Sequence, residues 1–354
     1  MPLLYLGRRE VEELLPMAEC IEVMAGVLAA LARGETLQPL RSVLRLRLSE
    51  RRGLLGMMPG QIPAASSPDA VAAPPLAPLA PLAPLAPLAP DIAGIKVITL
   101  YPDNRAHGLE SHQGAVLLFD TGTGSPIAYF DASSLTAIRT AAVSAVATRL
   151  LARDDAGDLA LLGAGVQAAA HLEAMAAVRR LRRVRVWSRS PESARRFAAA
   201  AVRRHAVAVE PAATAREAVA GADLVCTTTA SPKPILAGAW IAPGAHLNAV
   251  GACVATAREL DGAAVARARL FVDCRESALN ESGDFLLALR EGAIGEGHIQ
   301  GELGDLLLGR LAGRRDPAEV TLFKSLGVAV EDLAAAHHVY RKAVAARRGI
   351  VLET

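Results

Sequence analysis

The hydrophobic positions in the first third of the chain predict one helix and several strands. Apolar residues recur at three- and four-residue spacings from Met17 to Leu31, which indicates an amphipathic helix, and Gly34 follows as a stop signal. Apolar and basic residues alternate over 40–48 (LRSVLRLRL), as in a half-buried strand. Other predicted strands cover residues 2–6, 53–58, 94–100, 115–120 and 126–131, with the hairpin signal TGTGS before the last. This part is therefore predicted to mix α and β structure, with mostly antiparallel strands.

From residue 158 the pattern changes to short apolar runs that alternate with helical stretches. The apolar runs are LALLG, VRVWS, AVAVE, ADLVCTTT, AHLNAVG and RLFVD. Such alternation is typical of a parallel, doubly wound sheet of the Rossmann type. A last amphipathic stretch, at about 328–347, predicts a C-terminal helix. The predicted fold class is α/β, with a Rossmann sheet beside an α+β domain.

The first strand of this second region runs directly into the turn GAGVQA at 163–168. In a strand–turn–helix context, Gly163 permits the tight turn, Gly165 lets a pyrophosphate approach the backbone, and Ala168 lets helix and strand pack closely. Val166 and Gln167 open the helix whose N-terminus holds the phosphates. The turn predicts a dinucleotide site, although Gly/Ala-rich sequences also produce this motif by chance.

The end of the second predicted strand favours NADP(H) and leaves NAD(H) possible. An acidic residue there would bind the ribose 2′-hydroxyl of NAD, but the chain has WSRS at 187–190. Arg189 can instead offer its guanidinium to a 2′-phosphate, unless it is only a solvated surface charge. Further candidate cofactor-binding residues stand at the ends of the fourth and fifth strands, where threonines are also simply good strand formers: Thr227, Thr228, Val250 and Gly251.

Three cations before the dinucleotide region suggest a substrate that carries a carboxylate. Lys96 lies inside the apolar strand GIKVIT, where a lysine is costly unless it faces a site or a partner. Arg139 opens the predicted helix RTAAVSAVATRLL, and Arg41 lies at the start of the strand over 40–48. Arginine can clamp a carboxylate with two hydrogen bonds. The alternative is three unrelated surface or interface charges.

Composition narrows the class of protein. Hydrophobic residues make up 52% and charged residues 21% of the 354 residues, enough for a large core, and the net charge of +2 gives no support to a nucleic-acid partner. The four cysteines form no CxxC pair or zinc spacing, so we expect no metal. Charges in MPLLYLGRREVEELL occupy the place of a signal-peptide core, and polar residues interrupt the apolar stretch 158–178. We therefore expect a soluble cytoplasmic protein with no membrane partner.

Segments along nearly the whole chain carry a resemblance to a known family. They are MMPG at 57–60, GIKVITLYPDN at 94–104, GLESHQGAVLLFD at 108–120, LTAIRTAAVSAVATRLLA at 135–152, LLGAGVQAAAHL at 161–172, LNAVGA at 247–252, ARELD at 257–261, ESGDFLLAL at 281–289 and LFKSLGVAVEDLAAA at 322–336. In this order they resemble the ornithine cyclodeaminase/mu-crystallin family. The SHQ and WxR segments look most like its ketimine reductase branch.

The resemblance implies a domain arrangement and roles for particular residues. It implies a substrate-binding and dimerisation domain over 1–140, a Rossmann domain over 141–320, and a C-terminal helix over 321–354 that returns to the first domain. Members are typically homodimers. By their motifs, Arg41, Lys96 and Arg139 match the residues that bind the substrate carboxylate, and Ser111 matches a hydroxyl near the nicotinamide.

One departure from the cyclodeaminase pattern points to imine reduction. Cyclodeaminases carry an aspartate shortly after the NAVGA-like segment, where this chain has Cys253, and a neutral thiol is a poor base and no partner for an ammonium. We therefore expect NADPH-dependent reduction of small cyclic imino acids, such as pyrroline-2-carboxylate or piperideine-2-carboxylate. The alternatives are a cyclodeaminase or alanine-type dehydrogenase that uses NAD, and a non-catalytic NADPH-dependent binder of a small ligand.

The run PPLAPLAPLAPLAPLAP at 74–90 falls inside the first predicted domain, between two of its strands. Proline at every third position keeps such a segment extended. Because loops can lengthen at small entropic cost, we interpret the run as a tolerated insertion in a surface loop. The alternative is a docking ligand or a lid.

Overall fold

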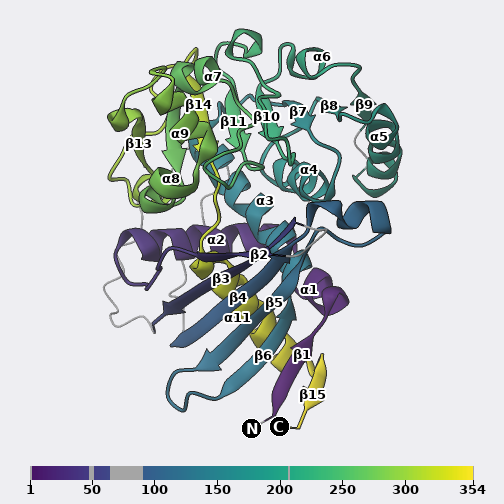
Figure 1. Ribbon diagram of the computed structural model, residues 1–354, viewed down its shortest axis with the longest axis vertical. Helices are drawn as coiled ribbons and strands as arrows, with labels where there is room; N and C mark the ends of the chain where they lie inside the picture. The colour runs from purple at the N-terminus through teal and green to yellow at the C-terminus, as the bar shows by residue number, and fades with distance from the viewer. Residues whose placement is uncertain (1, 48–51, 64–90, 206–207, 354) are drawn as a thin grey trace. The chain divides into compact units, whose positions relative to one another are not determined.

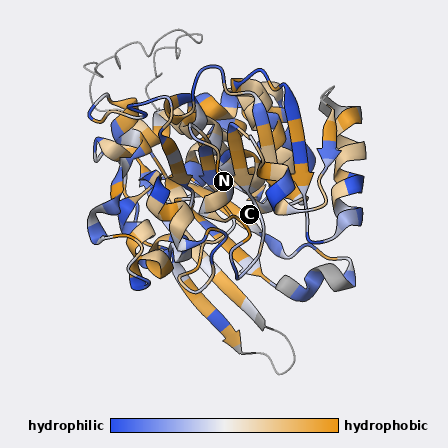
Figure 2. Cartoon of the chain, turned by 90° about the horizontal axis from the view of Figure 1, so that it is seen from above, coloured by the Kyte–Doolittle hydropathy of each residue, from blue (hydrophilic) through white to orange (hydrophobic). Residues whose placement is uncertain are grey.

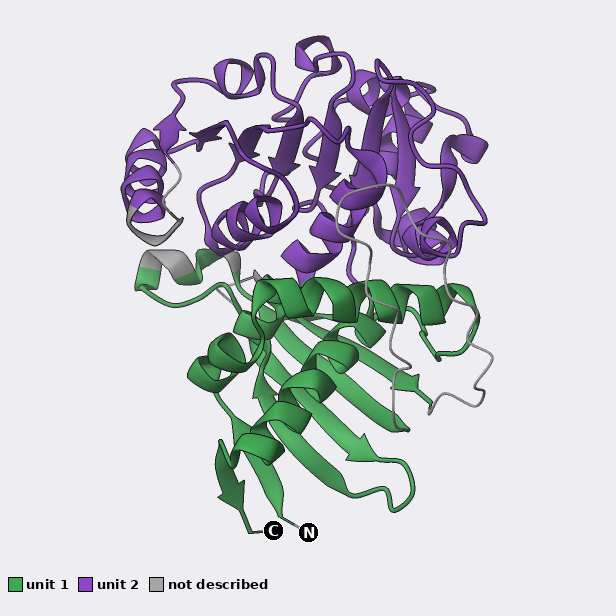
Figure 3. Ribbon diagram, turned by 180° about the vertical axis from the view of Figure 1, so that it is seen from behind, with its two compact units in different colours: residues 1–73, 82–139, 328–354 green, residues 74–81, 140–327 purple. Residues whose placement is uncertain are grey.

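The computed structural model describes residues 2–47, 52–63, 91–205 and 208–353. These residues form two compact units (Figure 3). Unit 1 contains the described residues up to 139 together with those from 328 onward, and unit 2 contains the described residues of 140–327. The run at 74–90 lies outside the described residues.

Unit 1 is built on a seven-stranded sheet with the order β15-β1-β6-β5-β4-β3-β2 (Figure 1). Its strands are β1 (Leu3–Leu6), β2 (Ser42–Arg47), β3 (Arg52–Ile62), β4 (Ile92–Leu100), β5 (His112–Asp120), β6 (Pro126–Asp131) and β15 (Ile350–Leu352). Only β1 and β6 pair in parallel among the neighbours of this sheet; the other described pairs are antiparallel. The predicted hairpin and the mostly antiparallel character of this region are confirmed.

One face of this sheet is covered by helices. They are α1 (Arg8–Leu14), α2 (Met17–Ala32) and α11 (Ala329–Ala346), and α11 contacts the other two as well as strands β3, β4 and β5. Successive side chains of a strand point to opposite faces, and Lys96 stands opposite Met58 and Val116 in the register. These three buried side chains therefore share the face that α11 covers.

Unit 2 is built on an eight-stranded sheet in which every described pair is parallel. Its strands are β7 (Asp158–Leu162), β8 (Arg183–Trp187), β9 (Val209–Pro211), β10 (Leu224–Thr227), β11 (His246–Ala249), β12 (Ala268–Val272), β13 (Ile299–Glu302) and β14 (Val320–Lys324). The order β9-β8-β7-β10-β11 is the 3-2-1-4-5 part of the Rossmann order, with its switch point between β7 and β10. Strand β14 takes the sixth position in the sheet, although β12 and β13 precede it in the chain and lie beyond it. The predicted fold class is confirmed.

Helices accompany the strands of unit 2, and hydrophobic residues concentrate along the strands (Figure 2). The helices are α4 (Val166–Val178), α5 (Pro191–His205), α6 (Ala215–Val219), α7 (Gly262–Arg267), α8 (Arg275–Glu281), α9 (Gly283–Arg290) and α10 (Leu303–Leu307). Short 3-10 turns are η1 (Pro102–His107) in unit 1 and η2 (Gly238–Trp240) and η3 (Glu296–His298) in unit 2. Alanine, valine and leucine side chains fill the core between these helices and the sheet.

Two predictions of element bounds differ from the structure. Helix α3 spans Ala132–Leu151, so Arg139 lies in its interior and does not open the helix. Residues 132–138 (ASSLTAI) form its first two turns, which the sequence pattern did not predict, because serine, threonine and isoleucine are weaker helix formers. The predicted end of the Rossmann domain at residue 320 comes too early, because β14 begins there and pairs with β11 and β12.

No described helix is by itself long and apolar enough to cross a membrane. Helices α1 and α2 together pass the same test of length and composition, but an 83° bend separates them. Most of α2 is buried in the core of unit 1.

Candidate functional site

The carboxylate-binding candidates of unit 1 meet two acids of the C-terminal helix. Lys96, in the middle of β4, is 2% exposed, and its Nζ donates to both carboxylate oxygens of Asp332 at 3.1 Å. Arg139, also buried, donates from Nε to Asp332 Oδ1 at 2.9 Å and from Nη1 to Glu331 Oε2 at 2.5 Å. Asp332 and Glu331 are fully buried in the first turn of α11. The four side chains form one buried ionic cluster.

Its surroundings make Lys96 easier to deprotonate than a lysine in water. Burial lowers the pKa of Lys96 to about 8, and the positive charges of Arg139 and Arg41 act in the same direction, whereas Asp332 opposes the shift. Arg41, partly exposed just before β2, is therefore near enough to act on Lys96. Burial alone would raise the pKa of Asp332, but Arg139 and Lys96 outweigh it and lower that pKa. Asp332 is thus an anion at neutral pH.

The cluster brings cationic and acidic side chains together in one buried place. Lys96 and Arg139 pair with Asp332 and Glu331, and Arg41 lies near enough to act on Lys96. Buried charges need such partners, because they lose their water. Two of the three cations predicted to bind a carboxylate are therefore held in fixed positions by acids of α11.

Two residues at the start of β5 adjoin the cluster. Burial lowers the pKa of His112 to about 4, and Lys96 and Arg139 add to this effect, so the imidazole is neutral at pH 7. Ser111 is partly exposed, and its carbonyl oxygen accepts a hydrogen bond from the Tyr101 amide at 2.8 Å. His112 therefore lies within electrostatic reach of Lys96 and Arg139, whereas the hydroxyl of Ser111 forms no hydrogen bond with the residues that the structure describes.

Glu331 and Asp332 are two site residues for which the sequence motifs predict no role. They lie within LFKSLGVAVEDLAAA. Like Lys96, two adjacent acids inside a strongly apolar stretch need buried partners. That signal identifies the acids, but not the cations that they contact.

The dinucleotide candidates of unit 2 lie at the carboxyl edge of the parallel sheet. Gly163 has a φ of +126°, and a Cβ there would lie 2.6 Å from Thr228 Oγ1, so the turn after β7 requires glycine. Helix α4 starts after Gly165 without a side-chain cap, which leaves the N–H groups of its first turn for a ligand. Val166 is 64% exposed and Gln167 is partly buried at this N-terminus. Ala168 is fully buried, as its predicted packing role requires.

Arg189 stands at the same edge, two residues beyond the end of β8. It is exposed and forms no hydrogen bond or ion pair with the described residues. The following loop is ordered by Ser190, whose Oγ accepts from the Ser193 amide at the start of α5. The guanidinium is thus presented to solvent beside the strand that follows the glycine turn.

The remaining cofactor candidates are organised by a buried carboxylate. Thr227 is 1% exposed, and its hydroxyl donates to Glu259 Oε2 at 2.7 Å. The Gly251 amide donates to the same oxygen at 2.7 Å. Thr228 is partly buried after β10, and the Val250 amide bonds to the Thr227 carbonyl. The Thr227 hydroxyl is therefore committed to the protein, while the backbone at 228 and 250–251 borders the sheet edge.

Cys253, which the resemblance places where cyclodeaminases carry an aspartate, follows this segment. Its side chain is partly buried, and the thiol donates to the Val250 carbonyl with Sγ and O 3.3 Å apart. The thiol is therefore held toward the backbone of its own loop.

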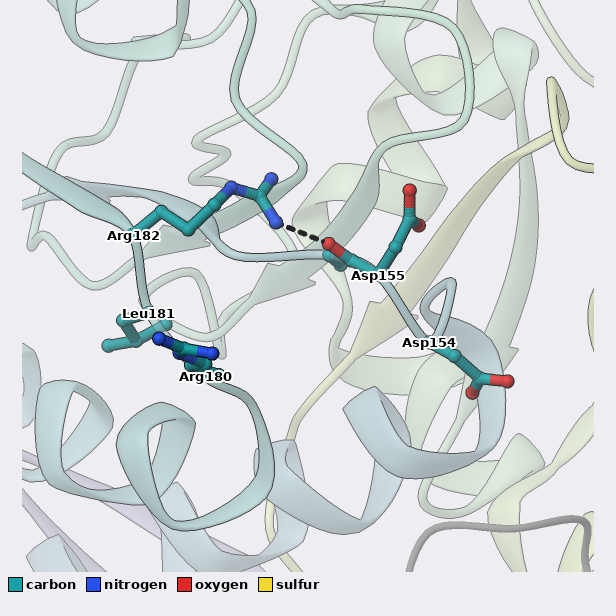
Figure 4. Close-up of a pocket in the computed structure, with 6 residues that line it drawn as sticks. Asp154, Asp155, Arg180, Leu181 and Arg182 are labelled. Atoms are coloured by element: carbon teal, nitrogen blue, oxygen red, sulfur yellow. Dashed lines mark hydrogen bonds between the residues drawn. The ribbon is translucent and has the colours of Figure 1, made fainter.

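A surface hollow of unit 2 lies at the opposite edge of the sheet (Figure 4). It is lined by Asp154, Asp155, Ala156, Arg180, Leu181 and Arg182. These residues precede β7 and β8, and Arg182 donates to the Asp155 carbonyl at 2.6 Å and to Asp223 at 2.7 Å. The hollow is therefore separate from the carboxyl edge, where ligands of doubly wound sheets bind.

Comparison with known proteins assigns the family. Residues 82–347 match the model of the ornithine cyclodeaminase/mu-crystallin family. The ketimine reductase mu-crystallin of Mus musculus is 39% identical over 307 residues, which cover 87% of this chain and 85% of the relative. The chain belongs to the ornithine cyclodeaminase/mu-crystallin family, and the resemblance stated from its motifs is confirmed.

Solved structures share the whole fold. The Δ1-pyrroline-2-carboxylate reductase of Thermococcus litoralis, in complex with NADH and L-proline, is 35% identical with a TM-score of 0.88, and the match covers 98% of this chain and 99% of that one. An archaeal alanine dehydrogenase dimer with bound NAD is 28% identical with a TM-score of 0.86, and the match covers 100% and 99%.

Removal of Asp332 should destabilise the protein strongly. In Asp332→Ala, Lys96 and Arg139 lose their shared carboxylate, and breaking a buried ion pair from one side costs about 3–5 kcal/mol. Urea unfolding should show a much lower midpoint. Glu13→Ala, which removes an exposed carboxylate paired with Arg9 and Arg348, should leave the midpoint almost unchanged. Equal midpoints for Asp332→Ala and wild type would contradict the importance of the cluster.

Proposed function

We propose that this protein reduces small cyclic imino acids with NADPH, converting Δ1-pyrroline-2-carboxylate or Δ1-piperideine-2-carboxylate to L-proline or L-pipecolate. It is an NAD(P)H-dependent oxidoreductase that acts on C=N bonds. The observation that carries the proposal is the buried cluster of Lys96, Arg139 and Asp332, with Arg41 close by, in a chain whose other unit has a dinucleotide-binding turn.

The cluster suits a small substrate with a single carboxylate. It brings Lys96 and Arg139 together with Arg41 close by, and arginine side chains can hold a carboxylate in a fixed plane. Fixing the carboxylate also fixes the adjacent C=N carbon, since the two are directly bonded in a cyclic 2-imino acid. Orientation of this kind supplies a large part of the rate enhancement in a reaction between two bound reactants.

The chemistry requires little from the side chains beyond this orientation. When bound, NADPH supplies the hydride that adds to the C=N carbon, and one proton adds to the nitrogen to give CH–NH. The residues of unit 1 hold the substrate carboxylate, and the turn at 163–168 with the N-terminus of α4 holds the pyrophosphate. The neutral His112 is available beside the cluster for a hydrogen bond to the substrate.

Cys253 supports reduction over cyclodeamination. Cyclodeamination of ornithine needs an anion for the distal ammonium, and Cys253 has a thiol in place of a carboxylate, directed at the Val250 carbonyl. The names of the mouse and Thermococcus relatives, a ketimine reductase and a pyrroline-2-carboxylate reductase, favour the same reaction. A cyclodeaminase, an alanine-type dehydrogenase and a non-catalytic ligand-binding protein are the competing functions. A cytoplasmic location remains our prediction from the sequence.

Arg189 supports NADPH as the preferred cofactor, although the solved relatives hold NADH or NAD. The exposed guanidinium stands after β8, the strand end that contacts the adenosine ribose in this fold, and no acid occupies the positions 187–190. A 2′-phosphate would gain a charge-assisted hydrogen bond from Arg189, whereas NADH would gain none.

The proposal is tested by steady-state kinetics with both cofactors. The purified protein should oxidise NADPH in the presence of Δ1-pyrroline-2-carboxylate and prefer NADPH to NADH. A charge-assisted hydrogen bond is worth about 1.5–3 kcal/mol, so Arg189→Ala should weaken NADPH binding roughly ten- to hundredfold and leave NADH binding unchanged. Equal losses for both cofactors would contradict the NADPH assignment.

The same assay separates the competing functions. Ammonia release from ornithine with NAD⁺ would establish cyclodeamination and overturn the proposal. Binding of NADPH without turnover of any cyclic imine would favour the binding protein. In a reductase, Lys96→Ala should abolish imine turnover while it leaves the affinity for NADPH unchanged.

Substrate binding should weaken above pH 8. Lys96 has a pKa of about 8 and binds a carboxylate only in its protonated form, so the KM for the imine should rise up to tenfold per pH unit above this value and stay level below it. Asp332, whose pKa is lowered, stays ionised throughout. Lys96→Arg retains its charge, so its KM profile should lack the rise. Because both proteins share the ionisation of the substrate, identical profiles would exclude Lys96 as the titrating group.

We further propose a homodimer that uses the open face of the unit 1 sheet. The helices gather on the Lys96 face, whereas the opposite face carries apolar, partly exposed side chains from four strands: Leu55, Met57, Ile95, Val97, Leu117, Phe119 and Tyr129. A contiguous apolar surface of this kind is typical of a subunit interface. The alanine dehydrogenase relative is described as a dimer.

A charge at the centre of this face should dissociate the dimer. Leu117→Glu places a carboxylate between Ile95 and Tyr129, which an apolar interface cannot accommodate. Sedimentation should give twice the chain mass for wild type and a single chain mass for the variant. Val202→Glu, on the exposed side of α5, is the matched control and should remain dimeric. A wild-type protein with the mass of one chain would refute the dimer.

A further inference from the structure

Glu259 is a buried carboxylate in unit 2 that accepts four hydrogen bonds. It is 0% exposed and lies two residues before the N-cap of α7. Oε1 accepts from the Thr229 amide at 2.6 Å and from the Thr229 hydroxyl at 2.7 Å. Oε2 accepts from the Thr227 hydroxyl and from the Gly251 amide, both at 2.7 Å. Each oxygen therefore receives one backbone N–H and one hydroxyl.

These bonds join two loops that leave neighbouring strands. Thr227–Thr229 lead out of β10, and Gly251 follows β11, both at the carboxyl edge of the parallel sheet. The loops are in close contact, since a Cβ at Gly251 would lie 2.0 Å from the Thr229 carbonyl oxygen and 2.6 Å from Glu259 Oε1. Glycine at 251 and the carboxylate of Glu259 together set the separation of the two loops.

Glu259 is itself held by a second buried carboxylate. Asp284 Oδ1 accepts from the amides of Glu259 and Leu260 at 2.8 and 3.0 Å. Lys324, at the end of β14, lies with Nζ 3.2 Å from Asp284 Oδ2, and it donates to the carbonyl of Ala249 at the end of β11. The network thus connects to β11 twice, through Gly251 and through Lys324. It restrains both the side chain and the backbone amide of Glu259.

Both terminal atoms of the side chain at 259 must accept a hydrogen bond from a backbone N–H. Burial and Asp284 raise the pKa of Glu259, while Lys324 and the two threonine hydroxyls oppose the shift. A hydroxyl can turn to accept a hydrogen bond, but a backbone N–H cannot. Replacement by glutamine would place an NH2 group, which cannot accept, against the amide of either Thr229 or Gly251, in whichever orientation the group is held.

The loops that Glu259 joins lie where one half of a bound dinucleotide is expected. In a doubly wound sheet, one mononucleotide half of a dinucleotide lies over the first three strands and the other half lies across the switch point. Here β7, β8 and β9 belong to the adenosine half, with the glycine turn and Arg189. Strands β10, β11 and β14 belong to the nicotinamide half.

We propose that Glu259 is a positioning residue for the nicotinamide half of the cofactor, because it fixes the loops after β10 and β11 against each other. It acts through Thr227, Thr229 and Gly251 and does not touch the reacting atoms. This role rests on the proposed dinucleotide function, and it adds that different residues hold the adenosine half and the nicotinamide half of the site in place. Loss of the hydrogen bonds of Glu259 should therefore affect binding of the nicotinamide half alone.

The test compares a whole cofactor with its adenosine half. Calorimetry on wild type and Glu259→Gln would measure the binding of NADPH and of adenosine 2′,5′-bisphosphate, which lacks the nicotinamide. We expect Glu259→Gln to weaken NADPH binding about tenfold and to leave the bisphosphate unaffected. Misplacement of a reactant by about 1 Å costs on the order of a hundredfold in rate, so kcat at saturating NADPH should also fall, by about ten- to hundredfold.

A milder variant and a matched control complete the design. Thr227→Val removes one of the four hydrogen bonds with little change in shape, and should produce a smaller loss of the same kind. Asp223→Asn alters a carboxylate at the opposite edge of the sheet, where Asp223 accepts from the amides of Gly157 and Asp158. It should lower the unfolding midpoint without changing kcat or the ratio of the two binding constants.

The outcomes distinguish the inference from the function on which it rests. If folded Glu259→Gln or Thr227→Val retains the wild-type kcat and NADPH affinity, Glu259 has no positioning role. Equal losses for NADPH and the bisphosphate would assign it a general structural role and overturn the inference. If wild-type protein binds neither ligand, the dinucleotide function fails and the inference fails with it.

Discussion

The ion pairs of Lys96 and Arg139 with Asp332 are the constraint on which unit 1 depends. Buried charges are tolerated only when opposite charges and hydrogen bonds replace the water that they lose. Lys96 and Asp332 are 236 positions apart in the chain, so their pairing requires the C-terminal helix to lie on the central strands of the sheet. The same pairing fixes the positions of two of the cations proposed for the substrate carboxylate. One set of contacts thus holds the helix on the sheet and orders these two side chains.

Unit 2 also contains buried carboxylates whose hydrogen-bonding partners replace the lost water. Glu259 and Asp284 are buried carboxylates whose partners are mainly backbone amides and hydroxyls of loops at the sheet edge. Because the lone pairs of each oxygen must be satisfied, the loops that provide the donors are held in one arrangement. In both units, buried acids bind the residues or loops that are proposed to contact a ligand. We therefore distinguish the proposed ligand-binding residues from the acids that hold them in place.

The proposed ligand-binding residues could be predicted from the sequence more readily than the acids that hold them in place. The turn at 163–168, Lys96 and Arg139 were identified because each conflicts locally with its surroundings, as glycines in an apolar run or as charges in apolar elements. Asp332 and Glu259 conflict with their surroundings in the same way, yet their roles depend on partners far away in the chain. Arg139 was recognised, but its place in a helix was wrong, since the residues of 132–138 give weak helix signals.

The sequence alone determined most strands of unit 1, the strand–helix alternation of the Rossmann sheet with its dinucleotide turn, the C-terminal helix, the family and the cations proposed for the substrate. Those features are encoded by periodicities and motifs of a few neighbouring residues, which depend on local backbone geometry. Only the tertiary structure decided which acids neutralise Lys96 and Arg139, which face of the first sheet stays open, and that Glu259 joins the loops after β10 and β11. Such pairings are selected by burial and charge between segments far apart in the chain, and no local pattern records them.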